Sequence, residues 1–450
     1  MKHLENIATV YFVGIGGIGM SALARYAIVL GKVVYGYDKT PTLLTSELIS
    51  EGMQITFTDA ISELPKELSK ETTLVVYTPA IPKNSVLLNH FITAGFEVVK
   101  RAKLLGEVTK NTLCLAVAGT HGKTTTSAIL GHIMAACNMP VTAFLGGIAE
   151  NYHSNFISKG TEITVVEADE FDRSFLQLEP DIACVTSMDA DHLDIYGDAF
   201  SIENSFKEFS KLVSNKNHLL FKKGLPLEGK TVAIEEPADF EAQNVRIEKG
   251  MYVFDLKTPS EYLKNLKFLL PGHHNLHNAV TALGMAITAG TPTPGLPKAL
   301  LSFKGVERRF SYKIKKPNLV LIDDYAHHPT EIDALYQAVS EMYPNDKKVI
   351  VFQPHLFSRT KDFGEGFAKS LSQFDEVFLL EIYPARELPM QGIDSQWLLN
   401  KIINPKKALL AKEHVAIKLK NSSCKVKLMV GAGDIGAEVE KVTKFLRDES

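Results

Sequence analysis

Short apolar runs alternate with helix-patterned stretches along almost the whole chain, and this alternation restricts the fold more than any other feature. From residue 8 to about 117, five runs read as strands, and the stretches between them, such as 18–30 and 85–94, carry apolar residues at helical spacing. Such alternation predicts a parallel sheet with helices on both faces. Any ligand of a doubly wound domain of this kind is expected beyond the carboxyl ends of the strands.

The same alternation returns twice further along the chain. A second block begins with a strand, a glycine-bearing loop and a helix at 112–134, and it ends near Gly305 after short β-like runs and another helix. A third block has apolar runs between 319 and 433 and ends in a charged helix at 435–448. Since an average domain has roughly 150 residues, we expect the 450 residues to form three α/β domains at 1–109, 110–305 and 306–450.

Composition excludes several classes of protein. The 49 basic and 52 acidic residues leave a formal net charge of −3, which disfavours a strongly basic nucleic-acid binder. No apolar stretch reaches the roughly 18 residues of a membrane span, and the N-terminus lacks the pattern of a secretory signal. The four cysteines are scattered without a CxxC pair, so neither a disulfide framework nor a cysteine zinc site is expected. A reducing, cytoplasmic location is the simplest interpretation.

A first glycine-rich loop, Gly14-Ile-Gly16-Gly17-Ile-Gly19, follows a predicted strand and precedes a helix. Glycines in this context let the backbone approach a diphosphate, whose charge faces the N–H groups at the helix start. Asp38 ends the second strand, where a carboxylate can bind ribose hydroxyls. Taken alone, the loop suggests a nicotinamide-dependent dehydrogenase, and glycines that serve only helix–strand packing are the plainer alternative. The loop indicates a nucleotide site without naming the nucleotide.

A second glycine loop lies between a strand and a helix and keeps the GK[ST] end of a P-loop, although Val117 stands where the strict spacing requires glycine. In such a loop the backbone N–H groups cradle phosphates, Lys123 neutralises the β/γ oxygens and the Thr124 hydroxyl binds Mg²⁺. A chance GKT on a surface loop is the alternative, which the flanking strand and helix disfavour. The loop consists of Gly119, Thr120, His121, Gly122, Lys123, Thr124 and Thr125.

Acidic residues follow two predicted strands of the second block. They are Glu167, Asp169 and Glu170 after one strand, and Asp189, Asp191, His192 and Asp194 after the next. Carboxylate oxygens suit Mg²⁺ on ATP. A lone histidine beside aspartates is often a neighbour of a helix cap, but the position of His192 at a strand end favours a metal or phosphate site. Because a dehydrogenase needs no ATP loop and a simple ATPase needs no dinucleotide-like domain, the two loops together point elsewhere.

With these motifs in this order, the sequence resembles the Mur ligase family. The resemblance implies an N-terminal Rossmann-like domain that binds a UDP-sugar, a central P-loop-type ATPase domain with a mixed sheet, and a C-terminal Rossmann-like domain that receives an amino acid. The matching elements span essentially the whole chain: VGIGGIGMSALA (13–24), AGTHGKTTT (118–126), EADEFDRSF (167–175), MDADHLDIYG (188–197), LPGHHNLHNA (270–279), GVERRF (305–310), DDYAHHPTE (323–331), FQPHLFSRT (352–360) and GAGDIG (431–436).

The resemblance implies ATP-dependent ligation of L-alanine to the carboxylate of UDP-N-acetylmuramate through an acyl phosphate, a cytoplasmic step of peptidoglycan precursor synthesis. ATP is then a co-substrate accompanied by two Mg²⁺ ions, and a monomer or homodimer with no nucleic-acid or membrane partner is expected. The first glycine loop and DDYAHHPTE favour this activity over attachment of murein tripeptide and over folylpolyglutamate synthesis. A non-enzymatic nucleotide-binding scaffold would not need the set of Lys123, Thr124, Glu167 and His192.

The family pattern also implies a role for each matched residue. The catalytic residues are Lys123, His192 and Glu167, and the metal ligands are Thr124, Glu167 and His192. The ATP contacts are Gly119–Thr125 with Asn275, Asn278, Arg309 and Asp324; the UDP-sugar contacts are Gly14, Gly16, Gly17, Gly19, Asp38 and Thr78; the amino-acid contacts are Tyr325, His327 and Arg359.

Several positions depart from the family pattern. His273 and Leu356 each stand where the family has arginine, and Thr78 begins an element that lacks one of the usual hydroxyls. Since a charge-assisted hydrogen bond contributes roughly 1.5–3 kcal/mol, Leu356 affects mainly the tightness of alanine binding. The position of the carbamylated lysine of several relatives is Phe206, with Lys207 beside it, so no such lysine is assigned.

Overall fold

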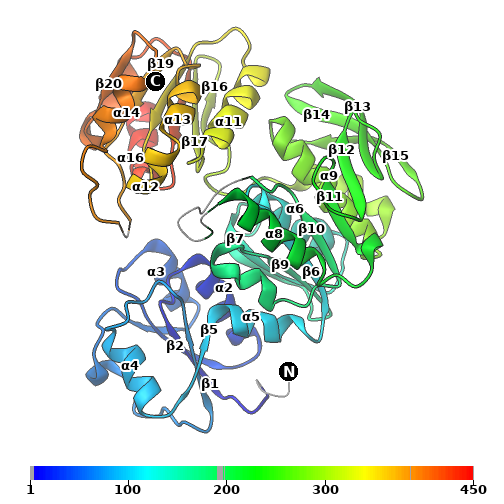
Figure 1. The fold of residues 1–450 in the computed structure, drawn as a ribbon, viewed down its shortest axis with the longest axis vertical. Coiled ribbons are helices and arrows are strands. Elements are labelled where there is room, and N and C mark those ends of the chain that lie inside the picture. Colours follow the sequence, from blue (N-terminus) through cyan, green and yellow to red (C-terminus); the bar gives the residue numbers. More distant parts are fainter. Residues whose placement is uncertain (1–4, 190–195, 197, 386, 449–450) are drawn as a thin grey trace. The chain divides into compact units, whose positions relative to one another are not determined.

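The computed structural model describes residues 5–189, 196, 198–385 and 387–448. Its three β-sheets belong to two compact units (Figure 1). Unit 1 comprises Met1–Asn244, Phe254–Leu266 and Asn278–Phe303, and unit 2 comprises Val245–Val253, Lys267–His277 and Lys304–Ser450. The predicted metal ligand His192 lies outside the described residues.

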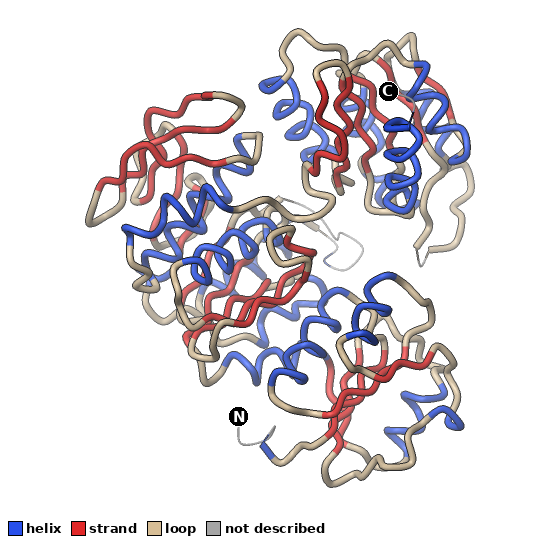
Figure 2. The backbone as a smooth tube through the Cα atoms, turned by 180° about the vertical axis from the view of Figure 1, so that it is seen from behind, coloured by secondary structure: helices blue, strands red, loops and turns tan. Residues whose placement is uncertain are grey.

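The first sheet is parallel and has the strand order β3-β2-β1-β4-β5. Its strands lie between helices (Figure 2), as the strand–helix alternation predicted. Helix α3 begins with a capping box between Thr42 and Thr45, and Ser85 caps α4. The elements are β1 (Thr9–Val13), α2 (Ile18–Val29), β2 (Val33–Tyr37), α3 (Leu43–Ser50), β3 (Gln54–Thr56), β4 (Thr73–Tyr77), α4 (Val86–Thr93), β5 (Glu97–Lys100) and α5 (Arg101–Thr109).

The second sheet has ten strands in the order β15-β14-β13-β12-β11-β10-β6-β9-β7-β8. Strand β6 is parallel to both of its neighbours, and β7 is antiparallel to β8, so the sheet is mixed as expected. The elements are β6 (Leu113–Ala118), α6 (Lys123–Ala136), β7 (Val141–Ala149), β8 (Ser154–Ser158), β9 (Ile163–Glu167), β10 (Ile182–Val185), α8 (Ala199–Ser210), β11 (Leu219–Lys222), β12 (Lys230–Ile234), β13 (Phe240–Glu248), β14 (Met251–Lys257), β15 (Tyr262–Phe268), α9 (His273–Thr288) and α10 (Leu296–Ser302).

Helix α2 of the first sheet also packs against β7 and β8 of the second. The ring of Tyr26 lies 5.4 Å from that of Phe144 and 6.4 Å from that of Phe156. Buried side chains from both sheets form one continuous apolar cluster. Because burial of shared apolar surface favours a single body, residues 1–244 belong to one compact unit.

The third sheet, in unit 2, has the order β16-β17-β21-β18-β19-β20, with β16 antiparallel to β17 and the remaining pairs parallel. Its central strands are almost fully buried, since helices cover both faces. The elements are β16 (Ser311–Lys316), β17 (Leu319–Asp324), α11 (Pro329–Met342), β18 (Lys348–Phe352), α12 (Phe357–Asp362), α13 (Gly364–Leu371), β19 (Glu376–Leu379), α14 (Ser395–Lys401), β20 (Lys407–Leu409), α15 (Val415–Asn421), β21 (Val426–Val430) and α16 (Ile435–Asp448).

The α/β class with three sheets agrees with the prediction, and each sheet lies within one of the segments 1–109, 110–305 and 306–450, whose limits stay a prediction. Strands β7, β8, β16 and β20 were not predicted. Over the part of the chain that the structure describes, no helix is long and apolar enough to cross a membrane.

Candidate active site

The second glycine loop connects β6 to α6 in the middle of the ten-stranded sheet. Gly119 has φ +131° and Gly122 has φ +85°, both in the region that favours glycine. A Cβ on Gly119 would lie 2.1 Å from Thr186 Oγ1, and one on Gly122 would lie 2.6 Å from Asn278 Oδ1. The loop is therefore sterically restricted to glycine at both positions, and it places the predicted ATP contact Asn278 beside Gly122.

Residues that follow β10 hold the loop in place. The backbone N–H of His121 donates to Ser187 Oγ at 2.8 Å, and the Thr186 hydroxyl donates to the His121 carbonyl. The Thr120 hydroxyl donates to the Asp189 carbonyl at 2.9 Å, and His121 Nε2 lies 3.5 Å from a carboxylate oxygen of Asp189. The conformation of the loop is thus fixed from the neighbouring strand.

Lys123, at the start of α6, forms an ion pair that the sequence analysis missed. Its ammonium donates to both carboxylate oxygens of Glu170, at 2.8 and 2.7 Å, and to the Gly119 carbonyl at 2.7 Å. The Glu170 side chain is only 3% exposed. Burial lowers the pKa of Lys123, but the carboxylates of Glu170, Asp169 and Glu167 outweigh it and raise the pKa above its usual range. Lys123 is therefore cationic at neutral pH.

Glu167, the last residue of β9, and Thr124, in the first turn of α6, are two of the predicted metal ligands and lie next to each other. Thr124 Oγ1 lies 3.2 Å from Glu167 Oε2, while Glu167 Oε1 accepts from Ser127 Oγ at 3.0 Å and from the Gly146 N–H at 2.6 Å. A Cβ on Gly146 would lie 2.4 Å from the Glu167 carboxylate. The carboxylate is oriented by three groups, with Oε2 towards Thr124.

The three acidic residues at the end of β9 have separate partners. Only Glu167 faces Thr124, whereas Glu170 binds Lys123 and Asp169 lies 3.7 Å from Arg101. Within the described residues, no group of three or more His, Cys, Asp or Glu side chains is placed to hold a metal. Asp191, His192 and Asp194 lie outside those residues.

The first glycine loop is shaped by close contacts in unit 1. A Cβ on Gly14 would lie 2.7 Å from the methyl group of Thr78, and one on Gly19 would lie 2.4 Å from the Arg101 guanidinium. Around Gly17 the nearest atoms would lie 3.6 Å from a Cβ, so the protein itself leaves room there. A Cβ on Gly16 would also lie 2.8 Å from Asp38 Oδ2. Packing thus accounts for Gly14, Gly16 and Gly19, whereas an added Cβ on Gly17 would make only ordinary contacts.

Asp38 contacts this loop rather than pointing away from it. Its Oδ2 accepts the Gly16 N–H at 2.8 Å, and its Oδ1 accepts the Thr40 N–H at 3.2 Å. The carboxylate predicted to bind ribose hydroxyls therefore also fixes the backbone of the loop.

In unit 2, Asp324 ends β17 and is bound by two backbone donors. The Phe310 N–H donates at 2.7 Å and the Ala326 N–H at 2.8 Å. Burial raises the pKa of Asp324 to about 6, although these donors and Arg309 act in the opposite direction. Asn275, also in unit 2, is buried and donates to the Pro271 carbonyl at 2.7 Å.

The predicted amino-acid contacts lie close together in unit 2. The guanidinium groups of Arg308 and Arg309 lie 5.1 and 5.3 Å from the Tyr325 ring. His327 stacks edge-on against Tyr325 and lies 6.2 Å from the His355 ring. His355 Nδ1 in turn lies 3.3 Å from Arg359 Nη1. Glu331 also contacts His327, with its Oε2 3.4 Å from Nδ1. This part of unit 2 is thus a row of arginine, histidine and tyrosine side chains with a carboxylate beside it.

Comparison with known proteins extends the resemblance. Three family models match in order: "Mur ligase family, catalytic domain" over residues 9–112, "Mur ligase middle domain" over 117–286, and "Mur ligase, glutamate ligase domain" over 308–435. UDP-N-acetylmuramate–L-alanine ligases of Flavobacterium psychrophilum and Christiangramia forsetii are each 60% identical to the chain, over 99% and 100% of it and over the whole of each relative. The chain belongs to the Mur ligase family. Mur ligases are ATP-dependent enzymes that form amide bonds, so the predicted enzyme class is confirmed.

Solved Mur ligase structures agree with the fold. The UDP-N-acetylmuramate–alanine ligase of Thermotoga maritima superposes with a TM-score of 0.82 at 27% identity, covering 98% of this chain and 100% of that one. A murein peptide ligase of Psychrobacter arcticus, at 20% identity, gives a TM-score of 0.70 over 98% of both chains and shows the shared fold. The predicted three-domain Mur ligase architecture is confirmed.

The departures from the Mur ligase pattern each have a local setting. Leu356 adopts φ +69° immediately before α12, and its N–H donates to the Tyr383 carbonyl at 2.9 Å. His273 lies 3.8 Å from Glu341. Phe206 is fully buried against the Phe175 ring, and the ammonium of its neighbour Lys207 pairs with Glu203 at 2.5 Å. The structure thus gives Lys207 an ion-pair role.

Proposed function

We propose that this chain joins L-alanine to the carboxylate of UDP-N-acetylmuramate with hydrolysis of ATP to ADP and phosphate. The observation that carries the proposal is the arrangement of Lys123 and Thr124 at the start of α6 with Glu167 at the end of β9, in a chain that is 60% identical over 99–100% of its length to relatives with this name. The catalytic, ATP-binding, sugar-binding and amino-acid-binding roles given to individual residues are part of this proposal.

A carboxylate is a poor acyl donor at neutral pH because its leaving group would be oxide. Transfer of the γ-phosphoryl group of ATP to the muramate carboxylate gives an acyl phosphate, which the alanine amine attacks to form a tetrahedral intermediate. Collapse of this intermediate expels phosphate and forms the amide. We assign to Lys123 the stabilisation of negative charge on the transferring phosphoryl group. Its raised pKa keeps the ammonium cationic, and α6 begins at this residue.

Oxygen donors around Glu167 fit a Mg²⁺ site. Glu167 Oε2 and Thr124 Oγ1 are hard ligands on adjacent elements, and Mg²⁺ usually takes one or two carboxylates, waters and substrate phosphates. When bound, the ion would neutralise charge on the phosphate oxygens of ATP. Glu167 and Thr124 would hold it, and Ser127 and the Gly146 N–H would keep the Glu167 carboxylate oriented.

The remaining substrates are assigned by chemistry. The loop at Gly14–Gly19 with Asp38 and Thr78 would bind the UDP diphosphate, since it precedes the N-terminus of α2. Tyr325, His327 and Arg359 would bind alanine, whose carboxylate suits the Arg359 guanidinium beside His355. Asn275, Asn278, Arg309 and Asp324 keep their predicted roles as ATP contacts.

Phosphate release from ATP tests the proposal. Release should require UDP-N-acetylmuramate together with an amino acid, and alanine should support it better than serine, glycine or the murein tripeptide. Release with tripeptide but not with alanine would assign the chain to the murein peptide ligases instead. Turnover of NADH would revive the dehydrogenase interpretation. The cytoplasmic location and the monomeric or homodimeric state stay predictions, for which fractionation and light scattering are the measurements.

A further inference from the structure

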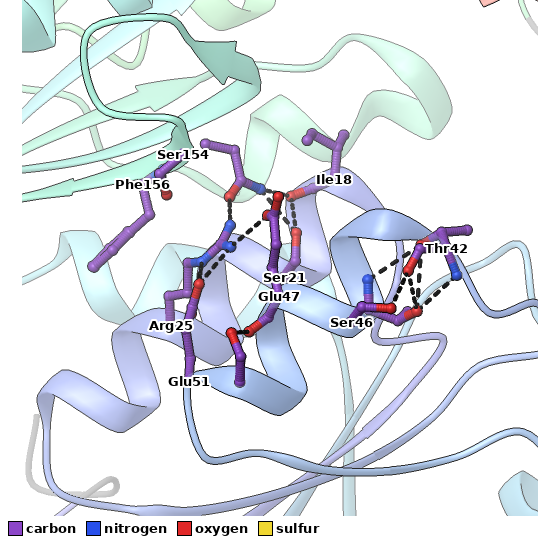
Figure 3. A network of polar contacts seen from close by, with 12 residues as sticks. Ile18, Ser21, Arg25, Thr42, Ser46, Glu47, Glu51, Ser154 and Phe156 are labelled. Atoms are coloured by element: carbon purple, nitrogen blue, oxygen red, sulfur yellow. Dashed lines mark hydrogen bonds and ion pairs between the residues drawn. The ribbon is translucent and has the colours of Figure 1, made fainter. Parts of the chain in front are cut away.

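Asn155 lies on β8, an edge strand of the second sheet, and binds the first turn of helix α2, which packs on the first sheet. Its Nδ2 donates to the Ile18 carbonyl and to Ser21 Oγ, the latter at 2.8 Å. Its Oδ1 accepts from Arg25 Nη1. Figure 3 shows Arg25 with its partners Glu47 and Glu51 close to Ser21 of the same helix. The side chain is 0% exposed, so both faces of this amide are used inside the protein.

The carbonyl that Asn155 binds belongs to the first glycine loop itself. Ile18 lies between Gly17 and Gly19 and is the first residue of α2. The helix has no side-chain N-cap, since Gly17 occupies that position. Asn155 therefore provides a side-chain contact to the turn whose backbone N–H groups face the carboxyl end of β1, where phosphate binding is expected.

Arg25 keeps Asn155 in this position. The guanidinium donates to both Glu51 oxygens, at 2.7 to 3.0 Å, and lies 3.3 Å from Glu47, while its remaining nitrogen donates to Asn155. Its side chain is 7% exposed. A buried guanidinium with its donors satisfied holds a fixed geometry, so the amide of Asn155 has one orientation, with its NH₂ group towards Ile18.

We infer that Asn155 is a positioning residue for the sugar nucleotide: the ATP-binding domain, through this amide, holds the diphosphate-binding turn at residues 17–19 of the N-terminal domain. The inference rests on the proposed function, because it takes the turn as the UDP-sugar site. Only an amide meets both requirements, two donors towards α2 and one acceptor towards Arg25. The carboxamide is thus matched to its two neighbours.

Calorimetric titration of the full chain with UDP-N-acetylmuramate, and separately with ATP, tests the inference. Asn155→Ala should weaken sugar-nucleotide binding about tenfold, the effect of one lost buried hydrogen bond with its carbonyl left unpaired, and should leave the ATP affinity within about twofold of wild type. Asn151→Ala is the matched control, since Asn151 lies four residues earlier and donates to the Ser302 carbonyl instead. It should bind both ligands as wild type does.

Arg25→Met separates positioning from general support of the interface. It removes the ion pair and the group that orients the amide, but Asn155 can still donate to Ile18, so the melting temperature should fall and sugar-nucleotide binding should weaken clearly less than in Asn155→Ala. Equal weakening by Arg25→Met and Asn155→Ala, or equal loss of ATP and sugar-nucleotide binding in Asn155→Ala, would overturn the inference.

Asn155→Asp serves if the alanine variant does not fold, because it keeps the acceptor for Arg25 and loses the donors for Ile18. It too should weaken sugar-nucleotide binding, and wild-type affinity in this variant would overturn the inference. Failure of the wild-type chain to bind UDP-N-acetylmuramate would instead overturn the proposed function, and the inference with it. The two failures are therefore distinguishable.

Discussion

The ammonium of Lys123 lies 2.7 Å from one carboxylate oxygen of Glu170 and 2.8 Å from the other, so the lysine assigned to the ATP phosphates is bound by a protein carboxylate in this structure. A phosphate that binds Lys123 has to share or replace this partner. Glu170 is nearly fully buried, and it therefore competes with the nucleotide from inside the protein.

Replacement of Glu170 by glutamine should lower the free energy of unfolding by about 1.5–3 kcal/mol, the contribution of a hydrogen bond to a charged group. ATP should then stabilise the variant more than it stabilises wild type, because the phosphates supply the missing countercharge. Thermal melting with and without ATP measures both effects. Asp169→Asn removes a nearby charge that pairs with Arg101 instead, and its gain with ATP should equal that of wild type.

Replacement of Lys123 by alanine should abolish turnover while UDP-N-acetylmuramate still binds. The reason is that the lysine belongs to the loop after β6, whereas the sugar nucleotide is assigned to the loop after β1. Phosphate release and calorimetric titration measure the two properties. Equal loss of both would contradict separate sites.

Gly146→Ala should disable the metal site without unfolding the chain. The new Cβ would lie 2.4 to 2.7 Å from atoms of the Glu167 carboxylate, which must turn away from Thr124. We expect the Mg²⁺ concentration for half-maximal phosphate release to rise roughly tenfold, since one oriented ligand is lost. An unchanged Mg²⁺ dependence would separate Glu167 from metal binding.

Gly17→Ala should show whether glycine at this position is needed for ligand binding or for packing of the protein. Gly17 has φ −66° and the protein leaves 3.6 Å around the added methyl group, so stability should fall only by about 0.5–1 kcal/mol, the difference between glycine and alanine at an N-cap. Sugar-nucleotide affinity should fall, because the methyl group occupies space next to the phosphate-binding turn. Titration with UDP-N-acetylmuramate measures this affinity. Wild-type affinity in the variant would mean that Gly17 serves packing alone.

The pKa of Asp324, raised by burial to about 6, predicts a pH dependence of ATP binding. If the carboxylate binds ATP, the KM for ATP should rise as the pH falls through about 6, and Asp324→Asn should show a high KM that no longer varies there. Folding stability should change in the opposite direction. Because the folded protein binds the Asp324 proton more tightly than the unfolded chain, the free energy of unfolding should rise as the pH falls from about 6 towards 3.8. Steady-state kinetics and melting across this range measure the two trends.

Much of the fold was predictable because the buried parallel strands can be recognised as apolar runs in the sequence. The strands at Leu113–Ala118 and Leu319–Asp324 are nearly continuous apolar runs, as expected for strands covered on both faces. Strands β7 and β8 were missed, since a glycine pair interrupts the first and the second is short and half polar. The order of the ten-stranded sheet depends on pairings between distant segments, which no local pattern encodes.

In the candidate site, too, some contacts were predictable from local sequence patterns and others were not. Thr124 and Glu167 were predicted to meet because both follow parallel strands of one sheet, and they do. Glu170 was grouped with the acidic residues, and only the three-dimensional structure shows its side chain on Lys123. Asn155 belongs to no motif, and its bond to Arg25, 130 positions away, requires the packing of two sheets.

The packing of Tyr26 against Phe144 and Phe156 also has a consequence for synthesis on the ribosome. Phe144 is translated 118 residues after Tyr26, which at about 5–20 residues per second is a delay on the order of ten seconds. Throughout this interval Tyr26 on α2 has been synthesised, but strands β7 and β8, which carry Phe144 and Phe156, have not. The nascent N-terminal domain therefore depends on the next segment of chain, or on a chaperone, to shield the Tyr26 ring.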